Sequence, residues 1–343
     1  MPDVLAEHHG LAYVHDHDPG IRLVATAHGF DYIGPGGRRV RDPEILERIH
    51  RLVIPPAWKD VWICEDPDGH IQAIGRDARG RKQYRYHPAW RCFRDEAKYE
   101  RALAFGRALP RLRRRIAADL RRRGLPREKV LAAAVRLLQV TLIRVGNDEY
   151  ARTNKSFGLT TLRKRHVKLN GAGAVFEFRG KSGVEHKTHF HDRRLARVLK
   201  RCESLPGQRL FQYVDHDGDR HAIGSAEVNA YLRAAMGEDF SAKDVRTWAG
   251  TLSAARALAL QPAATSATDA KRLVAICVKA VAGILGNTPT VCRTCYVHPA
   301  VLEAFEQGRL SRRLASHGRS AELALLKLLG EAAGWSSLGS RQG

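Results

Sequence analysis

The spacing of hydrophobic and polar residues divides the chain into a strand-like part and a helical part. From about residue 20 to residue 88, short β-type runs alternate with turn residues, a pattern typical of short strands. After Pro88 the chain is rich in Ala, Leu and Arg at helical spacing, which indicates amphipathic helices. The pattern predicts a β-rich domain at 1–90, a larger domain at 91–335 and a flexible tail at 336–343.

Within the first domain, turn and capping residues set the expected boundaries of the elements. Strands are expected at 21–25, 30–33, 61–65 and 70–74. The last two form a hairpin across the turn Asp66-Pro67-Asp68-Gly69. A short helix is expected after Asp42, because Asp is a good N-cap and Pro43 suits the first helical position.

The second domain is expected to be mainly α-helical, with one β element inside it. Helices are predicted at 95–109, 110–123 and 126–145, from Ser225, from Ser241 and at 268–285, where Gly286 is a natural C-cap. Strand-like runs at 157–162, 166–169 and 174–178 precede a return strand at 186–191, with a hairpin tip at 180–183. The fold class is therefore α+β: a small β-rich domain, then a mainly α domain containing a three-stranded β element.

The net charge of the chain indicates what kind of partner it binds. The chain of 343 residues has 58 Lys and Arg against 36 Asp and Glu, a net charge of +22, and its pI is near 10.2. Such a chain favours a polyanion such as nucleic acid, with an anionic membrane surface as the rival. No apolar run approaches the roughly 20 residues of a membrane span, and the start lacks signal-peptide features. We therefore expect a cytoplasmic, nucleoid-associated protein.

No residue cluster indicates a cofactor. The six cysteines are scattered, and Cys292-x-x-Cys295 has no second pair at zinc spacing, so reduced thiols are expected. Neither a carboxylate cluster for magnesium nor a phosphate-binding loop for ATP is present in the sequence. We expect an activity that needs neither ATP nor a metal.

One tyrosine near the C-terminus stands out as a candidate nucleophile. Tyr296 follows a long apolar helix and lies on a turn between two helices. Because a free phenol has a pKa of about 10, it would need surrounding cations to attack a phosphate at neutral pH. A packed tyrosine is the ordinary alternative.

Four further polar residues stand where a local rule prefers something else. Arg144 ends an apolar stretch, Lys181 lies between glycines at the hairpin tip, and Arg246 precedes a small and aromatic patch. Asn287 follows the predicted helix cap. Taken alone, the three cations could be a helix-terminal arginine, a turn lysine and a surface arginine.

Together these residues give the order Arg, Lys, Arg, Asn, Tyr, and the chain resembles the type IB DNA topoisomerases, specifically the compact poxvirus-type and bacterial branch. The resemblance covers essentially the whole chain. It includes Gly80-Arg81-Lys82-Gln83-Tyr84-Arg85-Tyr86 and Phe157-Gly158-Leu159-Thr160-Thr161-Leu162. Many type IB enzymes have His where this chain has Asn287, a neutral donor that cannot titrate.

The resemblance implies a role for each residue. Tyr296 would attack the scissile phosphodiester and hold a 3′-phosphotyrosyl bond while the 5′-hydroxyl end leaves. Lys181 would act as general acid to the 5′-oxygen, assisted by Arg144. Arg144, Arg246 and Asn287 would contact the non-bridging oxygens. Independently of the family, guanidinium groups suit the negative charge that gathers on a phosphoryl centre.

The implied substrate is double-stranded DNA held by a two-domain clamp. Arg81, Lys82, Gln83, Tyr84 and Tyr86 would present cations, an amide and aromatic rings to phosphates or bases, with packing inside the sheet as the alternative for the tyrosines. The expected reaction is relaxation of positive and negative supercoils by a monomer.

Two other functions fit part of the sequence. Tyrosine recombinases share the Arg, Lys, Arg and Tyr chemistry, but their second arginine usually ends a His-x-x-Arg motif, which here reads Lys243-Asp244-Val245-Arg246. A recombinase's N-terminal domain is also typically helical. A non-catalytic DNA-binding protein would explain the charge but would not require Tyr296 or Lys181.

Overall fold

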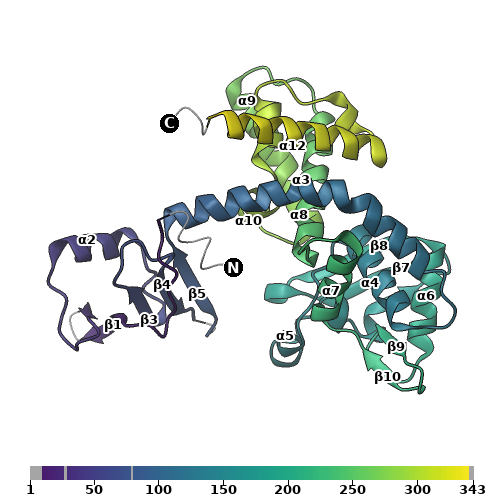
Figure 1. The fold of residues 1–343 in the computed structure, drawn as a ribbon, viewed down its shortest axis with the longest axis horizontal. Helices are drawn as coiled ribbons and strands as arrows, with labels where there is room; N and C mark the ends of the chain where they lie inside the picture. The colour runs from purple at the N-terminus through teal and green to yellow at the C-terminus, as the bar shows by residue number, and fades with distance from the viewer. Residues whose placement is uncertain (1–9, 27–28, 79, 340–343) are drawn as a thin grey trace. The chain divides into compact units, whose positions relative to one another are not determined.

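The computed structural model describes residues 10–26, 29–78 and 80–339 (Figure 1). The chain divides into two compact units, Met1–Tyr99 and Glu100–Gly343. The division falls inside helix α3 (Pro88–Asp119). The first unit contains a β-sheet and the second is mostly helical, so the predicted α+β fold class is confirmed.

The first unit is built on a five-stranded antiparallel sheet. Its strands, in spatial order, are β2 (Gly29–Ile33), β1 (Gly20–Thr26), β3 (Lys59–Cys64), β4 (Ile71–Arg76) and β5 (Lys82–Tyr86). The four predicted strands are confirmed, and β5 was not expected. Helix α2 (Pro43–Arg51) begins as predicted, because the Asp42 carboxylate accepts the Glu44 N–H at 2.8 Å. Ile49 of this helix packs on a core that includes Ile21 and Ile63.

Helix α3 corrects the prediction of two helices meeting at Pro110. Pro110 lies inside one continuous helix of 32 residues. A proline removes one backbone hydrogen bond and disfavours a helix interior. Here the buried face continues on both sides of it, through Phe105 and Leu109 before it and Leu112 and Ile116 after it. Packing of this face offsets the local cost of the proline.

The second unit is a helical assembly around one large core. Its other helices are α4 (Arg127–Thr141), α5 (Asp148–Thr153), α6 (Arg193–Ser204), α7 (Ser225–Met236), α8 (Ala242–Ala259), α9 (Ala267–Leu285), α10 (Pro289–Tyr296), α11 (Pro299–Glu306) and α12 (Arg319–Gly339). The predicted helix starts at Ser225 and Ser241 are confirmed to within a residue; the Asp244 carboxylate accepts the Ser241 N–H. Residues 336–339 of the predicted tail belong to α12, and 340–343 lie outside the described residues.

The β element of this unit is the three-stranded sheet β6 (Val167–Leu169), β7 (Gly173–Arg179) and β8 (Glu185–His191), with β7 in the centre. A separate hairpin joins β9 (Gln212–Val214) to β10 (Arg220–Ala222). The predicted strand at 157–162 is wrong, because Leu159–Thr161 form a 3₁₀ turn. The Gly158 N–H donates to the Thr161 hydroxyl at 2.8 Å, and the side chains of Leu159 and Leu162 are fully buried. A local side-chain hydrogen bond thus replaces strand pairing.

The corner between α9 and α10 brings the C-terminal candidates into place. Gly286 ends α9 in the left-handed conformation, with φ of 61°, as its sequence position predicted. After an 89° bend, Thr288 caps α10 and Pro289 is its first residue. No single helix in the described part of the chain is long and apolar enough to cross a membrane; α9 and α10 meet that test only as a bent pair.

Candidate active site

Arg246 lies at the centre of the candidate site. It projects from α8, is only 3% exposed, and donates to two main-chain carbonyls, those of Leu142 and Leu285, the latter at 2.8 Å. These carbonyls end α4 and α9, where the helix dipoles are negative. Burial lowers the pKa of Arg246, and the neighbouring Tyr296 opposes that shift. Arg246 is therefore a rigidly held cation whose described partners are neutral.

Arg144 stands beside it on the segment that follows α4. Its Nη2 donates to the Gly286 carbonyl at 2.9 Å and to Oδ1 of Asn287. Burial lowers the pKa of Arg144, as does the charge of Arg246, while Tyr296 raises it. The two guanidinium groups donate to the carbonyls of consecutive residues, Leu285 and Gly286, and no carboxylate among the described residues is hydrogen-bonded or ion-paired to either.

Tyr296 is the last residue of α10, directly before the turn that leads into α11. The Arg246 guanidinium carbon lies 5.2 Å from the centre of its ring, within the range of a cation–π contact. Thr251 of α8 donates its hydroxyl to the Tyr296 carbonyl at 3.2 Å. A Cβ on Gly250 would lie 2.7 Å from the same carbonyl oxygen, so the close approach of α10 to α8 requires glycine there.

Asn287 offers a donor to the same space. Its Oδ1 is taken by Arg144, whereas its Nδ2 is buried and has no hydrogen-bond partner among the described residues. The Nε of Arg246 is in the same state. Buried polar groups are nearly always bonded. Two such N–H groups beside a tyrosine are suited to an oxygen-rich ligand.

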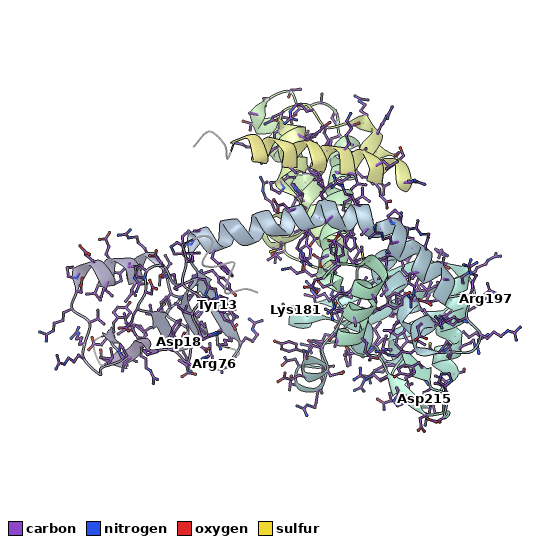
Figure 2. All side chains as sticks on the ribbon, in the orientation of Figure 1. Tyr13, Asp18, Arg76, Lys181, Arg197 and Asp215 are labelled. Carbon is purple, nitrogen blue, oxygen red and sulfur yellow. The ribbon has the colours of Figure 1, made fainter. Side chains whose placement is uncertain are left out.

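Lys181 is the one predicted residue that these contacts do not include. It is exposed and begins the short 3₁₀ turn at the tip of the β7–β8 hairpin, and Figure 2 shows it at the free end of that hairpin. It forms no hydrogen bond or ion pair with any described residue. The structure therefore brings Arg144, Arg246, Asn287 and Tyr296 together and leaves Lys181 on an adjoining turn.

His186, on β8, is a site neighbour that sequence reasoning missed. Its ring lies against Gly286, whose carbonyl accepts from Arg144, and burial, followed by the charges of Arg144 and Arg246, lowers its pKa. Its ring stacks on Phe178 with centroids 5.2 Å apart. In the sequence it looks like one of several histidines on a strand, so no local signal distinguishes it.

The five candidates for DNA contact lie in the first unit, on β5 and the turn before it. Arg81 pairs with Asp77 at 2.6 Å, Gln83 donates to the same carboxylate at 2.9 Å, and Lys82 pairs with Asp16. The rings of Tyr84 and Tyr86 stack with centroids 5.8 Å apart. Tyr84 is 39% exposed, whereas Tyr86 packs on the small core around Leu11 and Trp90. Packing explains Tyr86 better than Tyr84.

The cysteines add no metal centre to the site. Cys64, Cys202, Cys277, Cys292 and Cys295 are free thiols. Among the residues whose placement is described, no group of three His, Cys, Asp or Glu could hold a metal ion. Cys292 is fully buried, and burial raises the pKa of its thiol to about 11. Cys292 is therefore a packing residue, one helical turn before Tyr296 on α10.

Comparison with known proteins gives the family to which the chain belongs. Residues 87–315 match the family model of the eukaryotic DNA topoisomerase I catalytic core, and residues 29–77 match that of the bacterial DNA topoisomerase IB N-terminal domain. DNA topoisomerase 1B of Acanthamoeba polyphaga mimivirus is 33% identical over 268 residues, which cover 76% of this chain and 80% of that protein. DNA topoisomerase I of monkeypox virus is 23% identical over 270 residues, 76% of this chain and 82% of that protein. The chain belongs to the type IB DNA topoisomerase family.

Proposed function

We propose that this protein relaxes positive and negative supercoils in double-stranded DNA by cutting and resealing one strand at a time, without ATP or an obligatory metal. The observation that carries the proposal is the Arg246 guanidinium 5.2 Å from the Tyr296 ring, with Arg144 and Asn287 beside it. Family membership supports the same reaction. We further propose that the enzyme acts as a monomer on DNA in the cytoplasm, at the nucleoid.

Tyr296 is the proposed nucleophile. Its phenolic oxygen would form a bond to the scissile phosphorus as the bond from phosphorus to the 5′-oxygen breaks, and a 3′-phosphotyrosyl link results. The phenolic proton would pass to a water molecule in this step, and cations near the oxygen favour its attack on phosphorus. Arg246 and Arg144 supply two such cations.

The same cations would stabilise the transition state. Charge gathers on the non-bridging oxygens of the phosphoryl group, and preorganised donors in a water-poor site act strongly on it. Arg246 is anchored by Leu142 and Leu285, and Arg144 by Gly286. Because neutral carbonyls hold them, both guanidinium groups keep their charge for the phosphate. The unpartnered Nδ2 of Asn287 would add a neutral donor.

Lys181 is the proposed general acid. The departing 5′-oxygen is a strong base that needs a proton, and a lysine ammonium can donate one to it. Its exposed position at the hairpin tip leaves the ammonium free of acidic partners among the described residues. Arg144 would assist it at the 5′-oxygen.

Resealing reverses these steps. The phosphotyrosyl bond conserves the energy of the broken phosphodiester, so attack by the 5′-hydroxyl on phosphorus restores the strand and frees Tyr296. Rotation of the cut strand between the two steps releases supercoils. Arg81, Lys82, Gln83, Tyr84 and Tyr86 would hold the duplex during rotation through phosphate and base contacts.

Plasmid relaxation tests the proposal. Wild-type protein is incubated with negatively and with positively supercoiled plasmid in EDTA without ATP, beside Tyr296→Phe and the control Tyr213→Phe on β9. Relaxation of both plasmids by wild type and control, but not by Tyr296→Phe, is expected. No relaxation by wild type, or full activity of Tyr296→Phe, would refute it. Strand exchange between two specific duplexes would instead indicate a recombinase.

A further inference from the structure

His186 lies against two glycines at once. A Cβ built on Gly180 would overlap Cδ2 of its ring, and a Cβ built on Gly286 would overlap Cε1. Gly180 has φ of −97°, which other residues adopt readily, so its backbone alone does not call for glycine. The ring of His186 therefore fills space that is open only because both residues lack a side chain.

Each glycine directly precedes a residue of the proposed mechanism. Gly180 comes before Lys181 at the hairpin tip, and Gly286 comes before Asn287 at the α9–α10 corner. The Gly286 carbonyl also accepts from Arg144. One imidazole thus touches both the segment that carries the lysine and the segment that anchors the first arginine.

The His186 ring can hold the Gly180 segment in a fixed position relative to the Gly286 segment. It is held from its own sheet by stacking on Phe178, with ring planes 12° apart. Neither ring nitrogen forms a hydrogen bond with a described residue, so shape governs its contacts. Burial and the two arginines lower the pKa of His186, which favours the neutral form of the ring.

We propose that His186 is a positioning residue that fixes the lysine hairpin against the α9–α10 corner and so sets where Lys181 meets the leaving 5′-oxygen. This inference rests on the proposed function, because it requires Lys181 to be the general acid. His186 need not touch the DNA in this role.

A leaving-group experiment tests it. Single-turnover cleavage is measured on a duplex with the ordinary 5′-oxygen at the scissile bond and on one with sulfur there. A thiol has a pKa of about 8.5, so a thiolate leaves without a general acid. His186→Ala should cleave the oxygen substrate about 10- to 100-fold more slowly, since small misplacements of a catalytic group have effects of this size. It should cleave the sulfur substrate at nearly the wild-type rate, as should Lys181→Ala.

Three controls make the result decisive. His186→Phe keeps a flat ring and should retain most of the oxygen-substrate rate. Gly180→Ala should slow that rate, and Gly180→Ala with His186→Ala should be no slower than His186→Ala alone, since the two groups share one space. Circular dichroism and DNA binding confirm that each variant is folded.

The inference is overturned if His186→Ala cleaves the oxygen substrate at the wild-type rate or is slowed equally on both substrates. If Lys181→Ala cleaves the sulfur substrate at nearly the wild-type rate and His186→Ala does not, the role of His186 is refuted while the acid role of Lys181 stands. A Lys181→Ala enzyme that stays slow on sulfur would refute the acid role of Lys181, and this inference with it. A wild-type protein that does not relax supercoiled plasmid would instead refute the proposed function as a whole.

Discussion

Arg81 and Lys82 in the first unit are held in the opposite way to the two arginines of the candidate site. At the start of β5 and on the turn before it, Lys82 and Arg81 pair with the carboxylates of Asp16 and Asp77. In the candidate site, Arg144 and Arg246 instead donate to main-chain carbonyls and to an amide. The first arrangement neutralises charge and the second preserves it.

This difference separates binding from catalysis. A cation paired at the surface must exchange its carboxylate for a phosphate, so it gains little and depends on salt. A buried cation held by neutral groups has already lost its water and has no competing anion. It can act fully on charge that develops at a phosphorus.

Removing the central guanidinium should have the largest effect. Arg246→Ala is expected to slow single-turnover DNA cleavage about 1000-fold, the upper range for loss of one preorganised donor. Arg246→Lys should remain about 100-fold slow, because an ammonium cannot reproduce the planar fork. Arg272→Ala removes a cation that is paired with Asp269 on α9 and should cleave normally. A near-normal Arg246→Ala enzyme would contradict the contrast between the candidate site and the cations at β5.

A carboxylate placed in the site should pair with Arg144, as the carboxylates near β5 pair with Arg81 and Lys82. Asn287→Asp would set an anion against Arg144, neutralise it and repel the DNA phosphate, and cleavage should slow about 100-fold. Asn287→His restores an N–H donor and should stay within about 10-fold of wild type. Quenched-flow cleavage at matched DNA saturation measures both. Equal rates for the Asp and His variants would show that charge at this position is unimportant.

Arginines of the second unit also act on a buried imidazole. Burial first, and then Arg165 and Arg163, lower the pKa of His166 to about 4, and its Nδ1 accepts the Arg163 N–H at 3.1 Å. In the unfolded chain the pKa is about 6.5, so the unfolded state binds more protons between these values and stability falls as pH falls. From pH 7 to pH 5 the free energy of unfolding should drop by about 2 kcal/mol from this group.

Urea unfolding at both pH values, with NMR titration of the imidazole, checks this shift. His166→Asn lacks the titrating group, so its free energy of unfolding should change less with pH than that of wild type. A His166 that titrates near pH 6.5 in the folded protein would remove the basis of the prediction.

The paired cations of β5 should give the smallest effect. Lys82→Ala is expected to weaken duplex binding a few-fold and to reduce the slope of log K against log salt by about 1. Asp16→Ala releases Lys82 from its partner and should strengthen binding slightly. Fluorescence anisotropy across a salt series measures both. If Asp16→Ala weakens binding, Asp16 positions Lys82 for the DNA and does not compete with the phosphate for it.

The parts of the fold that depend on neighbouring residues in the chain could be predicted from the sequence. The Asp42 and Gly286 caps, the hairpin β3–β4 and the two-part α+β layout follow from single residues and periodicity. The break at Pro110 and the strand at 157–162 were wrong because packing of Phe105 and Leu112, and the Thr161 hydroxyl, outweigh local preference.

Part of the candidate site could likewise be predicted from the sequence, and part could not. Arg144, Lys181, Arg246, Asn287 and Tyr296 could be proposed from chemistry and family resemblance. Their anchoring could not, because the partners are backbone carbonyls at the ends of α4 and α9, and every residue has a carbonyl. His186 could not be found either, since its role depends on two glycines that lie 106 positions apart in the chain.

The central claim is that Tyr296 attacks phosphorus and carries the 3′ end of the cut strand. A suicide duplex labelled beside the scissile phosphate, trapped with wild-type protein and digested with protease, measures this directly by mass spectrometry. The prediction is a single nucleotide-linked peptide, modified on Tyr296 through a 3′-phosphate, which disappears in Tyr296→Phe. An adduct on another residue, a link to a 5′-phosphate, or no covalent adduct while the plasmid is relaxed would contradict it.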